Sequence, residues 1–327
     1  MKSGSLGIRA LKFNACLALV VWAAWFFIGG SFARTSIVKN WPVAVTMVFG
    51  ALVGGGTSEG GGAVAFPVFT KVLHIPAAQA RLFAFAVQTV GMGAASLSIL
   101  FLRIPIDRRV LPWAGMGGVI GLVTCTYLIV PHVPPQLVRI CFTVMVSSLA
   151  VALIILNLKE KGPRHQRCPI FGPREKALLV AAGLIGGLMS GLVGCGENIV
   201  TFMVMALLFR VSEKVVTPTT VILMTIVTIV GFGLHAFAIH DFSKQVCSYW
   251  LAGAPIAVVF APLGAYLCSR MTRDTIAGIL IFLISLEFLS TLILIPISRA
   301  VALTALGTLV VFGVLNWQMT RIDVYKA

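Results

Sequence analysis

The feature that most limits the fold of this chain is a series of long apolar runs with almost no charged side chains. Over the whole chain 59% of residues are hydrophobic and 11% are charged, whereas a soluble domain usually carries about 25% charged residues. This composition excludes a disordered chain and argues strongly against a soluble globular domain. In hydrocarbon, only helices and closed barrels satisfy their own backbone groups. Because the runs are unbroken rather than alternating, we predict an all-α polytopic membrane protein.

The net charge of +15 would in a soluble protein suggest binding to nucleic acid. Here the basic residues lie in short loops between apolar runs, which is typical of cytoplasmic loops, so no nucleic-acid partner is expected. Six basic residues between Lys159 and Lys176 also predict contact with anionic membrane lipids. The seven cysteines are odd in number and include no CxxC pair, which argues against a disulfide framework or a zinc site. No metal and no cofactor are expected.

The apolar runs divide into ordinary spans and two interrupted stretches. The first run, residues 13–30, is interpreted as an uncleaved helix, although Ser31-Phe32-Ala33 resembles a signal-peptide cleavage site. The interrupted stretches are residues 42–73, broken by glycines at 54–56 and 60–62, and residues 177–209, broken at 194–198. The remaining predicted spans are 80–101, 110–130, 136–158, 217–239, 246–268, 277–295 and 300–317.

The two interrupted stretches are related by a constant shift of 136 positions. Under this shift Gly50 falls on Gly186, Gly60 on Gly196, and Val110 on Val246. We therefore predict an internal duplication, which is frequent in secondary transporters. The predicted organisation is an N-terminal helix and loop (1–41), repeat 1 (42–158), a basic cytoplasmic loop (159–176), repeat 2 (177–295), and a C-terminal helix and tail (296–327).

The distribution of basic residues predicts the topology. If each interrupted stretch turns back as a hairpin, 18 of the 25 Lys and Arg residues fall on the side of the 159–176 loop. If each stretch crosses once, no bias remains. The positive-inside rule therefore favours two hairpins, each followed by about three spans, so that repeat 2 is inverted relative to repeat 1. Both termini are then expected in the cytoplasm of a protein embedded in the cell membrane.

The glycine clusters predict a binding site at the hairpin tips. A tip inside the membrane is tolerated where its backbone lines a cavity, and glycine permits the tight turns that it needs. The short helices that follow would point their N-termini into the tips, which attracts an anion. The expected substrate-binding residues are Gly60, Gly61, Gly62, Gly194, Gly196, Asn198, Gln88 and Thr225. The glycines at 115–118 and 183–187 are expected to serve helix packing only.

Three acids lie inside apolar runs, where a carboxylate is costly and a functional role is the default hypothesis. Glu59 and Glu197 stand at the two breaks, where each could also simply cap a short helix. Scarce water favours their neutral forms, so we expect them to couple transport to protons. Glu287 is interpreted either as a site residue or as one partner of an interhelical hydrogen bond.

These residues resemble the signature of a known family. Ser58-Glu59-Gly60-Gly61-Gly62 followed by Pro67 is similar to the glycine-cluster-plus-proline pattern of the TauE/SafE sulfite exporter family. The second copy runs from Gly194-Cys195-Gly196-Glu197-Asn198 to Met203, which stands where the pattern has a proline. The resemblance carries over to Gly60, Gly61, Gly62, Pro67, Gly194 and Gly196. It implies a secondary transporter of small sulfur-containing or organic anions, often linked to protons.

Three other functions remain open at this point. Glu59 and Glu197 could serve a cation transporter, since oxygen ligands suit hard cations. An intramembrane enzyme could use Ser190-Gly191 with His235, but the sequence around Ser190 lacks the spacing of a nucleophile motif. A channel is the third alternative, although duplicated broken helices favour alternating access. The sequence leaves the substrate, the direction of transport and the oligomeric state open, a homodimer included.

Overall fold

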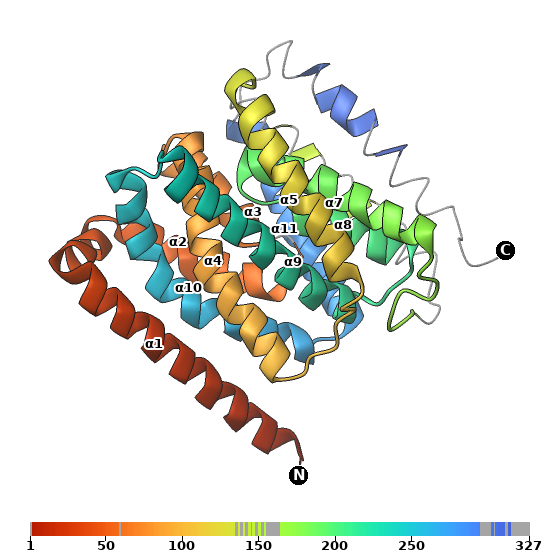
Figure 1. The fold of residues 1–327 in the computed structure, drawn as a ribbon, viewed down its shortest axis with the longest axis horizontal. Helices are drawn as coiled ribbons and strands as arrows, with labels where there is room; N and C mark the ends of the chain where they lie inside the picture. The colour runs from red at the N-terminus through yellow and green to blue at the C-terminus, as the bar shows by residue number, and fades with distance from the viewer. Residues whose placement is uncertain are drawn as a thin grey trace.

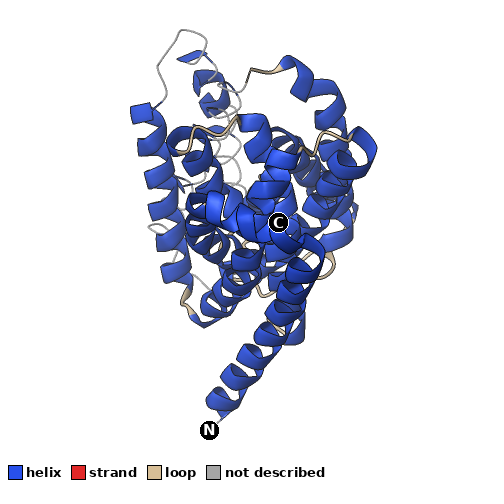
Figure 2. Ribbon diagram, turned by 90° about the vertical axis from the view of Figure 1, so that its left-hand side faces the viewer, coloured by secondary structure: helices blue, strands red, loops and turns tan. Residues whose placement is uncertain are grey.

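The computed structural model describes residues 2–58, 60–134 and 164–294, with scattered positions in 137–154 and 302–314. These residues form helices and no strand, apart from one isolated bridge between His165 and Val211 (Figure 2). Within this part of the chain, seven helices are long and apolar enough to cross a membrane. The prediction of an all-α polytopic membrane protein is therefore confirmed. The predicted spans 136–158 and 300–317 lie largely outside the described residues.

Apart from α1, the helices follow the predicted runs closely. The α-helices are α1 (Lys2–Lys39), α2 (Trp41–Gly56), α3 (Gly60–Pro67), α4 (Ala77–Phe101), α5 (Val110–Thr124), α7 (Pro173–Val193), α8 (Glu197–Met203), α9 (Glu213–Gly233), α10 (Lys244–Arg270) and α11 (Arg273–Leu294). The π-helical turns are η1 (Val68–Val72), η2 (Cys125–Ile129), η4 (Val204–Leu208) and η5 (Leu234–Ile239), and η3 (Val130–His132) is a 3-10 turn.

Helix α1 is longer than predicted and runs along the outside of the bundle (Figure 1). It is kinked at Gly30 and packs antiparallel to α10, where Trp22 donates to the Pro255 carbonyl and Trp25 to the Leu251 carbonyl, both at 2.8 Å. Its outer face is apolar, with Phe27 and Ile28 81% and 87% exposed. Such a face fits contact with lipid rather than water.

The first helix of each hairpin packs against a helix of the other half of the chain. A side chain at Gly55 of α2 would collide with the backbone of Ala261 in α10, and one at Gly191 of α7 would lie 2.6 Å from Cys125 Cβ, which follows α5. These two pairs are related by the shift of 136 positions. Helix α5 also approaches α7 so closely that Gly117 and Gly187 leave no room for a side chain. The glycines at 115–118 and 183–187 thus include close-packing positions, as expected.

The loops fix which segments share an end of the bundle. The amide of His165 donates to the Arg210 carbonyl at 3.0 Å, and the amide of Ser212 donates to the His165 carbonyl at 2.9 Å. The backbone amide of Asp107 donates to Thr219 Oγ1 at 3.1 Å. The loops 102–109, 164–172 and 209–212 therefore gather at one end, which we call the Asp107 end. Phe13 stacks on Phe101 and brings the start of α1 to the same end.

Candidate functional site at the hairpin tips

Hairpin 1 is the stretch α2–α3–η1, in which α3 runs back along α2. Gly60 has φ +74°, in the left-handed region that favours glycine, and so allows the chain to turn. A side-chain carbon on Gly54 would lie 2.5 Å from the backbone nitrogen of Gly61, and one on Gly50 would lie 3.7 Å from Ala65 Cβ. The two helices therefore meet backbone to backbone next to the tip.

Hairpin 2 is the stretch α7–α8–η4 and turns in the same way. Gly194 ends α7 with φ +90°, and Gly196 precedes α8 with φ +141°. A side-chain carbon on Gly186 would lie 2.5 Å from Glu197 Cα, a contact equivalent to that of Gly50 with Gly61. Ser190 stands at the position of Gly54, and its hydroxyl accepts the backbone N–H of Glu197 at 3.0 Å. Hairpin 2 thus caps an amide that hairpin 1 leaves without such a side chain.

The two tips meet around Gly60. A side-chain carbon on Gly60 would lie 3.0 Å from Asn198 Nδ2 and 3.5 Å from Gln88 Oε1. Gln88 comes from α4, and its amide nitrogen donates to the Gly194 carbonyl at 2.9 Å, which ties this residue to hairpin 2. The structure therefore brings together Gly60, Gln88 and Asn198, three of the residues predicted to bind substrate.

Several buried polar atoms at this junction have no hydrogen-bond partner among the described residues. They are both amide atoms of Asn198, Oε1 of Gln88 and the hydroxyl of Ser58. Asn198 and Ser58 are fully buried, and Gln88 is 3% exposed. A buried polar atom without a partner costs free energy, so such groups normally serve a ligand or an ordered water. Together these atoms can donate hydrogen bonds to a small polar ligand and accept hydrogen bonds from it.

Glu197 lies beside this junction but faces α5 and α7. Its side chain is fully buried, and Oε1 accepts the Thr201 hydroxyl at 2.8 Å within α8. Its other oxygen, Oε2, has no partner in the described part of the chain. A side-chain carbon on Gly118 would lie 3.0 Å from Glu197 Cγ, so a glycine makes the space for this acid. Glu59, the other predicted acid, lies outside the described residues.

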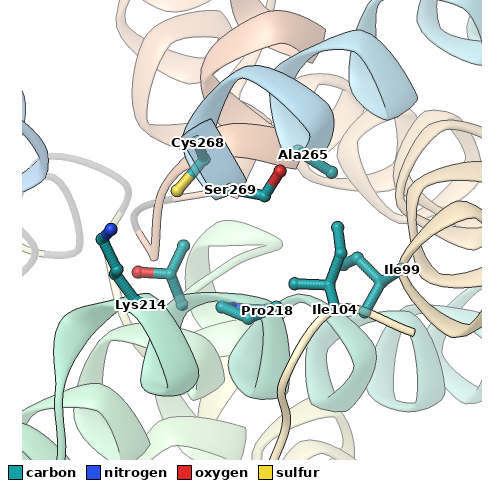
Figure 3. Close-up of a pocket in the computed structure, with 9 residues that line it drawn as sticks. Ile99, Ile104, Lys214, Pro218, Ala265, Cys268 and Ser269 are labelled. Carbon is teal, nitrogen blue, oxygen red and sulfur yellow. The ribbon is translucent and has the colours of Figure 1, made fainter. Parts of the chain in front are cut away.

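A small pocket lies behind the tip of hairpin 1, towards the Asp107 end. Its volume is about 10 Å³, room for roughly one water molecule. Figure 3 shows Lys214 and Cys268 on one side of the pocket and Ile99 and Ile104 on the other. The remaining lining residues are Gly55, Thr217, Pro218, Ala265 and Ser269. The Thr217 hydroxyl is buried without a partner among described residues, so the pocket combines a cation and a free hydroxyl.

The family described as Sulfite exporter TauE/SafE matches residues 43–291, which is most of the chain. The chain belongs to the TauE/SafE sulfite exporter family. The match begins in α2 and ends in α11, so it includes both hairpins and leaves α1 outside. No curated protein and no solved structure matches the chain. With seven candidate spans, the chain is a multi-pass membrane transporter, which confirms the prediction of a transporter rather than an enzyme.

Pro67 of the exporter signature has a structural place. It is the last residue of α3 and directly precedes η1. A proline within a helix removes a backbone donor and clashes with the preceding turn, which favours a change of helix type at this point. Hairpin 2 has Met203 there and makes the same change to a π-helical turn. The signature proline is therefore not required for the change.

Two other predicted residues, Thr225 and Glu287, lie in contacts away from the tips. The Thr225 hydroxyl pairs with Ser96 at 2.8 Å and donates to the Val221 carbonyl, which joins α9 to α4. Glu287 accepts from Lys71 at 3.3 Å, and from Thr143 at 3.1 Å, so it forms the interhelical contact that was one of its two interpretations.

The residues of the enzyme alternative also have separate partners. The Ser190 hydroxyl holds the amide of Glu197. The ring of His235 pairs with Asp241 at 3.0 Å and stacks on Phe85. The two side chains therefore take part in different contacts, consistent with membership of an exporter family.

Sequence reasoning missed two residues of the site, Gly54 and Arg81. Gly54 is the counterpart of Ser190 under the shift of 136, so comparing the two copies position by position could have found it. Arg81, in α4, is 8% exposed and donates to the Gly191 carbonyl at 3.2 Å near the end of α7. A cation is favourable at a helix C-terminus, but no pattern in the sequence links residues 110 positions apart.

Asp107 anchors the loops at the Asp107 end. Its carboxylate accepts two bonds from the Arg109 guanidinium, each at 3.0 Å, and the backbone N–H of Cys168 at 2.8 Å. Burial alone would raise the pKa of Asp107, but the bonds from Arg109 and Cys168 outweigh it and hold that pKa below its ordinary value. Burial raises the pKa of the Cys168 thiol to about 12.

The cysteines and acids of the described part form no metal site. Its six cysteines form no disulfide with one another, and four of them are buried. Cys168 and Cys195 lie in loops between helices. No group of three or more His, Cys, Asp or Glu side chains that could hold a metal ion occurs in the described ranges.

Proposed function

We propose that the protein is a secondary active transporter that moves a small sulfur-containing or organic anion across the cell membrane. The observation that carries this proposal is the buried junction of the tips, where the Asn198 amide and Gln88 Oε1 lie beside Gly60 without partners. Helix α3 begins at Gly60, so its first backbone N–H groups also lack partners within the helix. These donors, with the Asn198 amide, suit an oxyanion, and Gln88 Oε1 suits a hydroxyl that the anion retains.

Inverted halves would supply alternating access around this junction. Two observations support the inversion. The end of hairpin 2 lies at the Asp107 end, because Arg210 pairs with His165. The end of hairpin 1, residues 74–76, leads into α4, whose 25 residues span about 37 Å before the loop that carries Asp107. The hairpins therefore open to opposite ends of the bundle.

The same geometry supports one orientation in the membrane. The Asp107 end holds the start of α1 and the loops that carry most of the basic residues. We therefore assign it to the cytoplasm, with both chain termini on that side. A homodimer and contacts with lipids stay predictions from the sequence.

Proton coupling is assigned to Glu197 together with Glu59. The partnerless oxygen of Glu197 can hold a proton, and the next residue, Asn198, lies at the tip junction. A protonated acid beside the junction leaves an anion unopposed, whereas an ionised one repels it. Proton and anion would then favour each other's binding by linkage.

The test of transport uses purified protein in proteoliposomes with sulfite, sulfonates, carboxylates and phosphonates as candidate substrates. We expect counterflow of at least one anion by the wild type and its loss in Asn198→Ala. The matched control is Asn14→Ala in α1, away from the tips. If Asn198→Ala transports as well as the control, the junction is not the substrate site.

The test of coupling compares flux with and without a pH gradient. Glu197→Gln keeps the shape of the neutral acid, so we expect it to bind substrate but to respond less to the gradient. Glu59→Gln with Glu197→Gln should abolish the response. If the double variant is driven by the gradient as strongly as the wild type, the acids only cap the short helices.

A further inference from the structure

A second, larger cavity opens at the Asp107 end and is strongly basic. Its volume is about 510 Å³. Four arginines and one aspartate line it, a formal charge of +3 from four positive groups and one negative. The lining residues are Ile99, Leu100, Arg103, Ile104, Ile106, Asp107, Arg108, Arg109 and Arg167.

Three of the four arginines are available to a ligand. Arg109 is held by Asp107 and donates to the Cys168 carbonyl at 2.9 Å. The side chains of Arg103, Arg108 and Arg167 are exposed and form no hydrogen bond or ion pair with the residues that the structure describes. Clustered guanidinium groups without counter-ions attract anions and raise their local concentration.

The basic cavity shares a wall with the small pocket behind the tip of hairpin 1. Ile99 and Ile104 line both spaces. Gly55 of hairpin 1 also lines the small pocket. Figure 3 shows the side chain of Lys214 across this pocket from Ile99 and Ile104. Two apolar side chains thus stand between one basic space and another, along a line that leads to the back of the tip.

We propose that the basic cavity is the vestibule through which substrate anions enter or leave at the Asp107 end, and that Ile99 and Ile104 form its gate. The proposal rests on the proposed transport of an anion at the tips. Arg103, Arg108 and Arg167 collect the anion, and Lys214 receives it beyond the gate. An apolar constriction resists a hydrated ion until its side chains move, so the gate closes the path at rest.

The phosphate of an anionic lipid has the same chemistry as a soluble oxyanion and could occupy the same arginines. A lipid bound in the cavity would block the path of the substrate anion. The experiments therefore include vesicles of neutral phosphatidylcholine and vesicles that also contain phosphatidylserine.

The first experiment measures the half-saturating substrate concentration from each side of oriented proteoliposomes. For the triple variant Arg103→Gln, Arg108→Gln, Arg167→Gln we expect this concentration to rise about tenfold on the Asp107 side at low salt. It should be unchanged on the opposite side, and so should the maximal rate. At about 1 M salt, where charges are screened beyond about 3 Å, the difference should nearly vanish. Arg174→Gln, an exposed arginine of α7 outside the cavity, is the matched control. Equal values for the triple variant and the control would overturn the vestibule.

The second experiment does not depend on transport. The buried thiol of Cys268 lines the small pocket beyond the gate, so a faster modification when Ile104 is truncated reports passage of a reagent through the gate. Anionic and cationic methanethiosulfonates are applied from the Asp107 side, and labelling of Cys268 is read by peptide mass spectrometry. We expect Ile104→Ala to speed the labelling of Cys268 by both reagents. The triple arginine variant should lower the ratio of anionic to cationic labelling rates several-fold.

The outcomes separate this proposal from the proposed function. If the ratio falls while no anion is transported, the vestibule stands and the transport proposal fails. If transport is intact but the ratio is unchanged in the triple variant, the vestibule is wrong. If the arginines alter the ratio only in vesicles with phosphatidylserine, the cavity holds a lipid headgroup, which also overturns the vestibule.

Discussion

The two hairpins have the same backbone path but are stabilised differently. Hairpin 1 is held by glycine-only contacts at its tip and by a buried ion pair near its end, between Lys71 and Glu287. Hairpin 2 is held at its tip by the Ser190 hydroxyl, and its far end is tied to the surface loop that Asp107 anchors. The difference supports the proposed site, in which the tip of hairpin 1 would present its backbone to the substrate and the capped tip of hairpin 2 would support it.

Breaking the ion pair between Lys71 and Glu287 should give the largest loss of stability. Lys71 and Glu287 have side chains only 4% and 11% exposed, and Lys71 also donates to Ser290 and Thr291. Lys71→Met leaves a buried carboxylate unpaired, which should lower the free energy of unfolding in detergent by about 3–5 kcal/mol.

The control for this variant is Leu207→Met, at the equivalent position of hairpin 2, which should cost less than about 1.5 kcal/mol. Adding Glu287→Leu to Lys71→Met should recover most of the loss. Equal costs at Lys71 and Leu207 would mean that the pair does not hold hairpin 1.

The same substitution at the two equivalent glycines should separate the roles of the tips. Gly60→Ala places a carbon 3.0 Å from Asn198 Nδ2, in the junction itself. We expect transport to fall about 100-fold, because a displacement of about 1 Å in positioning groups can cost that much.

Gly196→Ala instead places its carbon 2.7 Å from Met189 Cβ, within hairpin 2. It should lower the thermal stability while the folded fraction still transports. If both variants lose only stability, the junction of the tips is packing and not a site.

Removing the Ser190 cap of hairpin 2 should give a smaller loss of stability. Ser190→Ala removes the acceptor of the Glu197 N–H and should lower the free energy of unfolding by about 1 kcal/mol. Ser98→Ala in α4 is the matched control, because its buried hydroxyl has no partner among the described residues and its loss should be nearly neutral. Denaturant titration of both variants measures the difference, and equal values would contradict the capping role.

Removing the Asp107 carboxylate, which anchors the end of hairpin 2, should give the smallest loss of stability. This loss should disappear at acidic pH. The folded pKa of Asp107 lies below its ordinary value, which is about 3.9 in an unfolded chain. Its stabilising contribution is therefore complete above about pH 4 and is lost as the pH falls through the folded pKa.

The stability of the wild type should thus exceed that of Asp107→Asn at pH 7, and the two should converge on acidification. Thermal melting across this pH range measures the difference. A difference that stays constant with pH would show that the carboxylate does not titrate with folding.

The sequence predicted the backbone features well, because they are encoded locally. Glycine runs indicated both breaks, and the shift of 136 positions pairs Gly50 with Gly186, which make equivalent contacts in the two hairpins. Apolar runs indicated the spans, although α9 begins at Glu213 rather than at 217. The kink of α1 at Gly30 allows a helix far longer than the predicted 13–30.

The side-chain partners could be predicted only in part, because they depend on contacts between distant segments. Gln88 and Asn198 were named as cavity residues and do meet at Gly60, but Thr225 is bound to Ser96 instead. The partner of Glu287 is 216 residues away in sequence, and nothing near either residue indicates the pair. The orientation of Glu197 towards Gly118 depends on how α5 packs on α7, which no local pattern encodes.

Two of the π-helical turns bear on how the halves of the chain are related. A π-helical turn amounts to one extra residue in an α-helix and is rare. The turns Val68–Val72 and Val204–Leu208 occupy the same register in both hairpins, and each is followed by a left-handed residue, His74 or Arg210, at equivalent positions. Two independent insertions at one register would be a coincidence, whereas inheritance of one insertion needs a single event. If the halves arose by the predicted internal duplication, the ancestral half-molecule already contained a bulged hairpin before it was copied.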